Sequence, residues 1–581
     1  MRRRIAIAAV VLAAALVAAG VANGQERELW PGVTFQQTIQ LTPNGPVVID
    51  VVTGPRPGGT TTLEPLLSND TLGGRETLTA LETRLSPVAT YAGVNGDLFN
   101  LKTGIPSGAF VREGAIVSEP TGDRSTAGVT ADGTLDVRRV SFAGAWTGTG
   151  GARPLDVNHL PGPNGSALFT SAWGATAPAF PGSAAAVLFP FTAVTPGIDL
   201  LTPVQSIVVG AAAVAIPAAG AVVVARGSAA AALQAEVPVG TTMKVRADLQ
   251  PAWPGLVAAI GGGPQIVRDG APVFSSGEVF TTLQLGERAP RTGVGQLEDG
   301  RIILVTVDGR QPGWSVGMTN WELAQALVRL GAVTGMALDG GGSTTMAFDG
   351  SLLNRPSDSV ERPISTALAF AYTGVFVGQP LPTVSPNGDG VDDVQPLSYR
   401  LVRPATSTVT LGAPDGSTPV AQTLDQLPGT FPVAFPPIPG ATLAEGTWKL
   451  TVTATDDIGQ ATTMTRTFTV DNTLGFLQTS VPRLFLPPGG RDLTISCNST
   501  RTARTVATVE TKSGEVVRTL ALRRYDAGDQ SVVWNGLDRQ KKRVKGGVYR
   551  ARVVAKSVLG TVQLVRTFTI RQIAGPPKAS S

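Results

Sequence analysis

The segment GAVTGMALDGGGSTTMAFDG, residues 331–350, constrains the fold most, because a short apolar run ends in Asp339 and three consecutive glycines. The run 336–338 predicts a strand that delivers Asp339 to a site. Successive glycines are tolerated mainly where the backbone needs positive φ or where another group approaches it closely. The alternative is a glycine-rich hairpin turn. The amides and hydroxyls after Asp339 predict a cavity of donors suited to a phosphate: Gly340, Gly341, Gly342, Ser343 and Thr344.

Composition narrows the architecture and the chemistry. A chain of 581 residues is too long for one domain, and 69 Gly and 44 Pro with few long helical patterns favour strands and turns. The net charge of +4 is small and its basic residues are scattered, so a nucleic-acid partner is not expected. One Cys and one His exclude an intramolecular disulfide and a Cys/His zinc site.

The N-terminus is typical of an export signal. Arg2, Arg3 and Arg4 precede an apolar run and small residues, which predicts a signal peptide at residues 1–24. An uncleaved N-terminal anchor is the alternative. The second long apolar stretch, residues 207–225, is interrupted by glycine and proline, so we expect two buried strands around a PAAG turn. We therefore expect a secreted or cell-surface protein without a membrane span after cleavage.

In two segments the apolar residues recur at the spacing of an α-helix. Residues 73–84 form a polar, capped segment with apolar residues at helical intervals. Thr319 with Glu322 three positions later forms a capping box, and the apolar face that follows predicts a helix ending at Gly331.

Further polar residues come at the ends of other expected strands. In YAGVNGDLFN, residues 91–100, a strand delivers Asn95 and Asp97, although Asn-Gly also predicts a plain β-hairpin. The lone His159, beside Asn158, is more typical of a surface residue than of a catalyst. The remaining candidates follow or precede expected strands: Arg291, Asp308, Arg310, Asn354, Arg355 and Arg362.

Eight motifs in one order carry a resemblance: GVNGDLF, AIGGGP, PRTGVG, VDGR, TNWELA, ALDGGGSTTM, NRPSD and ERPISTALAF. Over residues 45–375 the chain resembles the phosphodiester glycosidase family, which includes a lysosomal "uncovering" enzyme. The resemblance implies an α/β domain, or α+β, with twisted mixed sheets. It also implies hydrolysis of sugar-1-phosphodiesters between the anomeric carbon and the phosphate. The disulfides expected of a lysosomal relative cannot form with a single Cys, so its substrate should not be carried over.

The chemistry available to these residue types agrees with this resemblance. A carboxylate can stabilise or attack an oxocarbenium-like centre, and a leaving phosphate needs cations and amide donors. Our hypothesis makes Asp339 the catalytic carboxylate and Asp97 or Asp308 a second acid/base. The expected substrate contacts are Asn95, Thr344, Asn354 and the glycine-rich loop, with phosphate bound by Arg291, Arg310 or Arg355. The alternatives are paired surface charges for Arg291 and Arg310, a turn for Asp308, and a solvated rim for Arg355 and Arg362.

The C-terminal third predicts two all-β Ig-like sandwiches, at residues 379–472 and 473–575, after a catalytic domain at residues 25–378. Residues 445–470 and 546–570 repeat one pattern: glycine, aromatic residue, alternating strand, turn and RTFT followed by Val or Ile. Residues 534–553 resemble the Ig-like module of flagellar hook-capping proteins. Such modules usually space or anchor a catalytic domain. Cys497 is expected to be buried in the second sandwich.

A metal site is one interpretation of SPNGDGVDD, residues 385–393. At this spacing, the side chains of Asn387, Asp389, Asp392 and Asp393 could supply oxygen ligands to calcium. The segment lacks the glutamate of an EF-hand loop, and a structural turn is the alternative. No motif in the sequence indicates a cofactor that the protein would require.

Two functions remain open. One is an exported hydrolase of sugar phosphodiesters, with a cell-envelope glycopolymer as substrate. The other is a non-catalytic surface protein that binds glycans or mediates adhesion. The intact Asp339 and Asp97 motifs favour the enzyme, because a binding protein has no need of the acidic pair.

Overall fold

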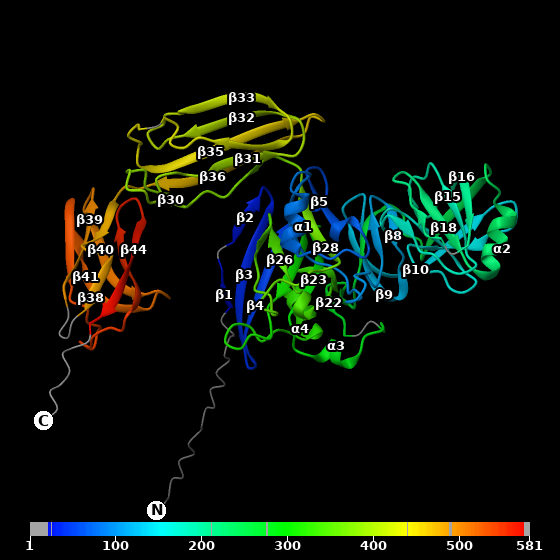
Figure 1. Cartoon of the computed structure of the whole chain (residues 1–581), viewed down its shortest axis with the longest axis horizontal. Coiled ribbons are helices and arrows are strands. Elements are labelled where there is room, and N and C mark those ends of the chain that lie inside the picture. The colour runs from blue at the N-terminus through cyan, green and yellow to red at the C-terminus, as the bar shows by residue number, and fades with distance from the viewer. Residues whose placement is uncertain are drawn as a thin grey trace, which may run out of the picture. The chain divides into compact units, whose positions relative to one another are not determined.

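The computed structural model describes residues 21–24, 26–210, 212–274, 277–438, 440–486 and 491–573. The chain divides into two compact units between Thr373 and Gly374 (Figure 1). Most of the expected signal peptide, residues 1–20, lies outside the described residues, and Val21–Asn23 pairs as β1 with β3. In the part of the chain that is described, no helix is long and apolar enough to cross a membrane.

The expected α/β catalytic domain is wrong, because the described residues are almost all β. They contain four α-helices of at most ten residues: α1 (Leu78–Leu85), α2 (Gly227–Glu236), α3 (Thr282–Gly286) and α4 (Asn320–Arg329). Among the described strand pairs of the first unit, only the two-residue pair β12–β13 is parallel. Antiparallel neighbours can be joined by short turns, so the sheets need few crossover helices.

A nine-stranded sheet carries the loop with Asp339. Its main path is β1 (Val21–Asn23), β3 (Val33–Thr42), β4 (Gly45–Gly54), β24 (Ile302–Val307), β23 (Arg291–Leu297), β25 (Ala332–Ala337), β21 (Gln265–Arg268) and β22 (Ala271–Pro272), while β2 (Arg27–Trp30) pairs with β3. Leu323 and Leu327 of α4 pack on one face, in a core with Val47, Val305 and Ala337. The helix therefore fixes the strands that position Asp339.

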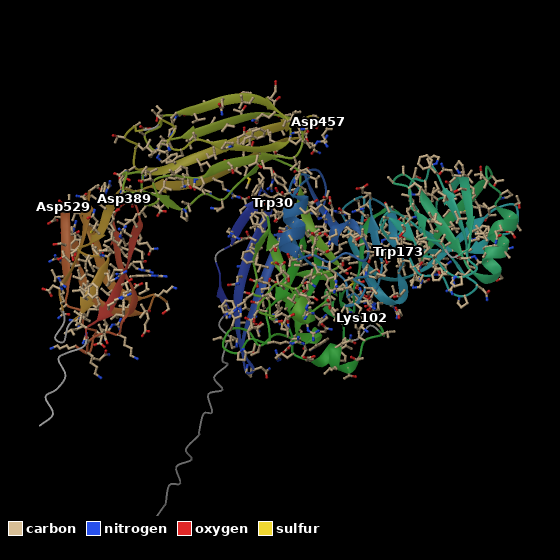
Figure 2. All side chains as sticks on the ribbon, in the orientation of Figure 1. Trp30, Lys102, Trp173, Asp389, Asp457 and Asp529 are labelled. Atoms are coloured by element: carbon tan, nitrogen blue, oxygen red, sulfur yellow. The ribbon has the colours of Figure 1, made fainter. Side chains whose placement is uncertain are left out.

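A five-stranded sheet packs against the other face of the nine-stranded sheet. Its order is β27 (Ser351–Leu352), β26 (Met346–Phe348), β6 (Thr90–Asn95), β28 (Thr366–Tyr372) and β5 (Thr61–Leu67). Between the sheets, Trp30 (labelled in Figure 2) stacks on Tyr372 with ring centroids 5.6 Å apart. Leu78 and Leu81 of α1 cover the outer face of the five-stranded sheet. The two sheets are thus held face to face, each with a helix on its outer side.

A twelve-stranded sheet completes the first unit, with a two-stranded ribbon, β14 (Thr176–Ala177) and β17 (Val214–Ala215). The sheet runs β12 (Asp156–Val157), β13 (Ser166–Phe169), β18 (Ala221–Ala225), β15 (Ala184–Leu188), β16 (Leu200–Val209), β19 (Thr242–Gln250), β10 (Leu135–Thr147), β9 (Thr121–Thr130), β20 (Leu256–Gly261), β7 (Phe110–Arg112) and β8 (Ala115–Ser118), with β11 (Arg153–Pro154) on β10. The apolar stretch 207–225 ends β16, forms β17, and then forms the buried strand β18.

The second unit contains two sandwiches with the same strand order, which confirms the expected all-β repeat. The first has a three-stranded sheet, β29 (Phe376–Val377), β31 (Leu397–Leu401) and β34 (Gly429–Val433), and a five-stranded sheet, β30 (Thr383–Val384), β36 (Ala461–Val470), β35 (Gly446–Asp456), β32 (Ala405–Gly412) and β33 (Val420–Gln426). The second has β37 (Leu474–Thr479), β39 (Leu493–Ser499) and β42 (Gly528–Trp534), and then β38 (Arg483–Leu486), β44 (Thr561–Gln572), β43 (Gly547–Lys556), β40 (Ala503–Thr511) and β41 (Val516–Tyr525).

Local predictions in both units are confirmed. Thr77 caps α1, and Thr319 with Glu322 forms the complete capping box of α4. Gly331 follows that helix with a φ of 94°. Cys497 is buried in the core of the second sandwich.

Candidate functional site

The ends of β6 and β25 bring the two acidic motifs together. The Asp339 amide donates to the Gly96 carbonyl at 3.0 Å, and the Asn95 side-chain amide donates to the Asp339 carbonyl at 2.7 Å. β6 belongs to the five-stranded sheet and β25 to the nine-stranded sheet. The contact between the two sheets therefore places Asp97 close to Asp339, although 242 positions separate them in the sequence.

A pocket of about 190 Å³ opens at this junction. Asp339 lies in its wall with two of the predicted arginines, Arg291 and Arg310. The other described lining residues are Leu98, Gly263, Phe280, Gln284, Glu287, Ala289, Asn320, Leu338, Gly340 and Gly341. Asp339 and two guanidinium groups thus line one small cavity, together with the half-exposed carboxylate of Glu287.

Asp339 has the electrostatics of a titratable site group. The pKa of its carboxyl is raised to about 6, chiefly by burial and also by the negative charge of Asp97, while hydrogen bonds from Ser343 and the Gly340 amide oppose the rise. The Arg362 guanidinium also favours the ionised form. Near neutral pH the Asp339 carboxylate is therefore mostly ionised, and it gains a proton in mildly acidic solution.

Asp97 is buried and paired with a residue that the motifs did not indicate. Its two carboxylate oxygens each lie 3.4 Å from a nitrogen of the Arg124 guanidinium, which comes from β9. Burial raises the pKa of Asp97, and the charge of Arg124 is the largest opposing effect. A Cβ on Gly261 would lie 2.7 Å from the Asp97 carboxylate, so the glycine of AIGGGP lets two strands close around this carboxylate.

Asp308 makes a different set of contacts. Its carboxylate accepts hydrogen bonds from Trp314 Nε1 at 2.7 Å, Asn354 Nδ2 at 3.0 Å and the Arg355 amide at 3.1 Å. Burial raises the pKa of Asp308, and these donors lower it. Asp308 is 1% exposed and is not among the described residues that line the pocket. Through these hydrogen bonds, the Asp308 carboxylate connects residues 308–315 to residues 354–355.

Asn354 and Arg355, predicted as substrate contacts, belong to this same network. Asn354 Oδ1 accepts from the Met346 amide at 2.8 Å, and its Nδ2 also lies 3.3 Å from the Thr344 carbonyl. The guanidinium of Arg355 lies 5.7 Å from the centroid of the Trp314 ring. Neither residue is among the described lining of the pocket.

The glycine-rich loop is a tight turn whose amides mostly bond within the protein. Gly341–Ser343 forms the short 3₁₀ helix η2, with Gly341 at a φ of 63°. The Gly341 amide donates to the Pro290 carbonyl at 2.9 Å, and the amides of Ser343 and Thr344 donate to carbonyls of the loop itself. The Gly340 amide bonds Asp339. The loop therefore orients Asp339 rather than presenting a row of open donors.

The arginines around the pocket differ in their burial and in the groups that hold their side chains. Arg291 Nε donates to the Met318 carbonyl at 2.9 Å, and burial lowers the pKa of Arg291 to about 10, so it remains charged at neutral pH. Arg310 is about half exposed and pairs with Glu287 at 3.1 Å. Arg362 lies 3.5 Å from Ser343 Oγ and pairs with Asp358 at 2.6 Å. Arg291 and Arg310 are the cations in the described pocket wall.

Sequence reasoning missed one wall of the pocket. Phe280, Gln284 and Glu287 come from α3 and its flanks. Thr281 and Gln284 form a capping box there, a local signal that could have indicated this helix. By contrast, Arg124 lies within the strand β9, and no local motif around it indicates a contact with Asp97.

Two other sequence candidates lie outside this pocket. The His159 side chain is 65% exposed and lies 3.8 Å from Glu119, as expected of a surface residue. In residues 385–393, Asp393 accepts the amides of Asn387, Gly388 and Gly390, and Asp389 (Figure 2) accepts that of Val391. Among the described residues, no group of three or more His, Cys, Asp or Glu side chains could hold a metal ion. The calcium interpretation stays a prediction.

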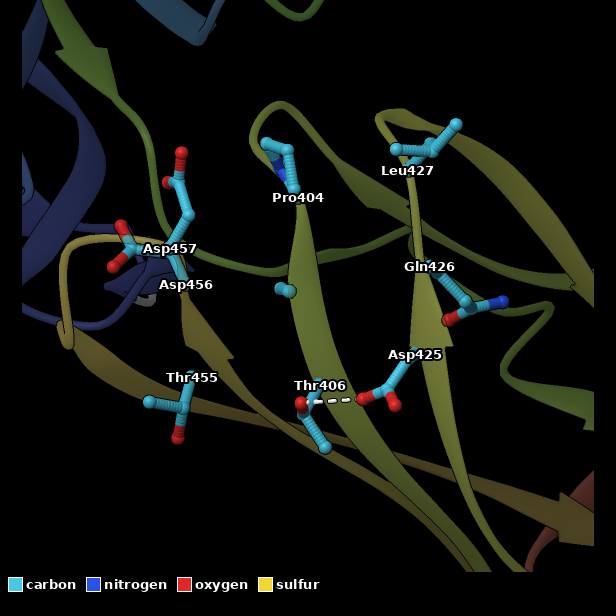
Figure 3. A pocket seen from close by; sticks show the side chains of 9 residues that line it. Pro404, Thr406, Asp425, Gln426, Leu427, Thr455, Asp456 and Asp457 are labelled. Atoms are coloured by element: carbon cyan, nitrogen blue, oxygen red, sulfur yellow. Dashed lines mark hydrogen bonds between the residues drawn. The ribbon is translucent and has the colours of Figure 1, made fainter.

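The second unit has a larger but open hollow of about 370 Å³, shown in Figure 3. Thr406 Oγ1 donates to Asp425 at 2.6 Å, the bond drawn in that figure. Asp456 and Asp457 both pair with Arg403, at 3.4 Å and 2.6 Å. The carboxylates of this hollow are thus engaged within the sandwich, and we assign it no function.

Comparisons with known proteins support part of this picture. Residues 203–371 match the phosphodiester glycosidase family, and residues 488–558 match the FlgD Ig-like domain. The first match contains Asp339, Arg291 and Arg310, whereas Asp97 precedes it.

Three similar proteins illustrate the extent of the likeness. N-acetylglucosamine-1-phosphodiester alpha-N-acetylglucosaminidase of Bos taurus is 40% identical over 90 residues, 16% of this chain and 17% of that protein. The SPbeta prophage-derived uncharacterized protein YomE of Bacillus subtilis is 33% identical over 110 residues, 19% of this chain and 17% of that protein. A solved hypothetical protein from Synechocystis aligns at a TM-score of 0.49 and 27% identity, over 59% of this chain and 62% of that one.

The curated matches span about a fifth of their relatives' length or less. They nevertheless include the N-acetylglucosamine-1-phosphodiester alpha-N-acetylglucosaminidases of cattle, mouse and human. The chain thus contains a region similar to the phosphodiester glycosidase family at residues 203–371 and a region similar to the FlgD Ig-like domain at residues 488–558.

Proposed function

We propose that the protein hydrolyses sugar-1-phosphodiesters between the anomeric carbon and the phosphate. The observation that carries the proposal is the position of Asp339. It lies in the wall of a pocket with Arg291 and Arg310, inside the region that matches the phosphodiester glycosidase family. A carboxylate for the sugar and cations for the phosphate are the two groups that this reaction needs.

Asp339 would act on the sugar side of the scissile bond. With a pKa of about 6, it is mostly ionised at neutral pH and can stabilise or attack the developing oxocarbenium centre. The bond between the anomeric carbon and the phosphate oxygen breaks. Water then supplies the hydroxyl on the anomeric carbon, and the products are a free sugar and a phosphomonoester.

Arg291 and Arg310 would act on the phosphate side. A phosphate leaves as an anion without needing a proton, so cations that stabilise its charge suffice. Arg291 is held by backbone carbonyls, which suits a fixed contact, while the half-exposed Arg310 can adjust to the substrate. Glu287, paired with Arg310, would have to release that guanidinium or share it.

Of the two predicted second carboxylates, Asp97 is better placed. Its charge contributes to the raised pKa of Asp339, whereas the carboxylate of Asp308 is occupied by Trp314, Asn354 and Arg355. We propose that Asp97 acts on Asp339 through its charge. The N-terminal pattern and the Ig-like modules support an extracytoplasmic enzyme acting on a cell-envelope glycopolymer.

The test is hydrolysis of a panel of UDP-linked sugars by the mature protein, with and without calcium. We expect wild type to release free sugar and Asp339→Asn to lose at least about 1,000-fold in kcat, as is common when a catalytic carboxylate is removed. Asp299→Asn is the matched control, because Asp299 is an exposed carboxylate paired with Arg301. Folded wild-type protein that releases no sugar across the panel would overturn the proposal and favour glycan binding.

A further inference from the structure

The backbone of Asp339 is held on both sides by the end of β6. Its amide donates to the Gly96 carbonyl at 3.0 Å, and its carbonyl accepts from Asn95 Nδ2 at 2.7 Å. The glycine-rich turn that follows holds the carboxylate itself, through the Ser343 side chain and the Gly340 amide. The backbone position of Asp339 therefore depends on its attachment to β6.

The Asn95 amide is itself oriented by two donors. Thr292 Oγ1 donates to Asn95 Oδ1 at 2.7 Å, and the Thr345 amide donates to the same oxygen at 3.1 Å. With Oδ1 occupied in this way, Nδ2 must point to the Asp339 carbonyl. Thr292 Oγ1 also lies 3.4 Å from Thr344 Oγ1, so the same hydroxyl contacts the end of the glycine-rich loop.

Neither side chain can reach a ligand. Asn95 is 1% exposed, Thr292 is fully buried, and neither is among the described lining of the pocket. This burial argues against the predicted role of Asn95 as a substrate contact. We propose that Asn95 and Thr292 are positioning residues that fix the backbone of Asp339 and thereby aim its carboxylate into the pocket. The inference rests on the proposed function, since it takes Asp339 as the reacting carboxylate.

The chain offers a matched control one strand away. Thr306 lies directly opposite Thr292 in the β23–β24 pair and is also fully buried. Within the described residues, its hydroxyl has no hydrogen-bond partner. Thr292→Val and Thr306→Val make the same chemical change at adjacent buried positions, but only the first removes a hydrogen bond to Asn95.

We would measure kcat and KM for Thr292→Val, Thr292→Ser and Thr306→Val. Thr292→Val should lose about tenfold in kcat, the effect of one well-formed hydrogen bond, with KM within about twofold of wild type. Thr292→Ser should recover most of the loss, because it restores the hydroxyl. Thr306→Val should match wild type. Equal losses in Thr292→Val and Thr292→Ser, or wild-type kcat in Thr292→Val, would overturn the inference.

Hydrogen exchange keeps the inference testable if the proposed function fails. In Thr292→Val, amides of residues 339–345 should exchange about tenfold faster than in wild type, while those of β18 stay unchanged. Thr306→Val should leave both segments unchanged. An inactive wild type would refute the hydrolase, whereas unchanged exchange at residues 339–345 in Thr292→Val would refute the positioning role.

Discussion

Asp97 and Arg124 form a buried ion pair that joins two sheets. Both carboxylate oxygens of Asp97, after β6 of the five-stranded sheet, lie 3.4 Å from the guanidinium nitrogens of Arg124, in β9 of the twelve-stranded sheet. The side chains are 1% and 11% exposed. Because the charge of Asp97 raises the pKa of Asp339, this pair connects the twelve-stranded sheet electrostatically to the pocket.

Replacing Arg124 should change the pH dependence of the reaction. In Arg124→Met, the pKa of Asp97 rises further and the carboxyl becomes neutral, so its charge no longer raises the pKa of Asp339. The acidic limb of kcat/KM should move down by about one pH unit. The free energy of unfolding should fall by about 3 kcal/mol, the usual cost of breaking a buried pair. Arg124→Lys should keep most of the wild-type profile, and an upward shift in Arg124→Met would contradict this account.

The wild-type pH profile tests the state in which Asp339 works. The proposed mechanism needs the ionised carboxylate, whose pKa is about 6. kcat/KM should therefore rise about tenfold per pH unit below pH 6 and level off above it. Initial rates between pH 4 and pH 8 provide the measurement. Activity that falls as pH rises through 6 would mean that Asp339 acts as an acid.

Arg310 should contribute to substrate binding and little to stability. Its pair with Glu287 is about half exposed, so removing it should change the free energy of unfolding by less than about 0.5 kcal/mol. Arg310→Ala should raise KM about tenfold, because a cation that contacts phosphate is lost. Arg301→Ala is the control, since Arg301 is also half exposed but lies outside the described pocket wall. Equal KM values in the two variants would remove Arg310 from the site.

Asp50 should make the first unit less stable as pH rises. Burial raises the pKa of Asp50 from 3.8 to about 8, so the folded state keeps a proton that the unfolded chain releases above pH 4. Stability should therefore decline between about pH 4 and pH 8. Asp50→Asn keeps an oxygen for Gln37 and should raise the free energy of unfolding by about 2 kcal/mol at pH 8, with little change at pH 4.

The control for Asp50→Asn is Glu298→Gln, which neutralises an exposed carboxylate of the same unit. Denaturant unfolding at the two pH values gives the comparison. A gain from Asp50→Asn that is as large at pH 4 as at pH 8 would show that ionisation of Asp50 is not the cause.

Local patterns predicted local structure well. The capping box of Thr319 and Glu322 joins residues three positions apart, so its geometry follows from the sequence of one turn. The repeated strands β35–β36 and β43–β44 could be predicted for the same reason: alternation and turn residues act within a hairpin. The prediction of an α/β class was wrong because it was inferred from a resemblance. The strands pair antiparallel and need no crossover helices, and this pairing cannot be predicted from any one segment of the sequence.

The sequence by itself determined that Asp339 follows a strand at a glycine-rich turn and that two similar β-modules come after it. With one Cys and one His, it also left carboxylates and arginines as the abundant groups from which a site can be built. Only the tertiary structure decided which polar side chains face the pocket. Asn95 and Asp308 come from motifs as suggestive as that of Asp339, yet their side chains bond to Thr292 and Asn354. These partners lie 197 and 46 residues away, and such contacts depend on how the sheets pack rather than on local spacing.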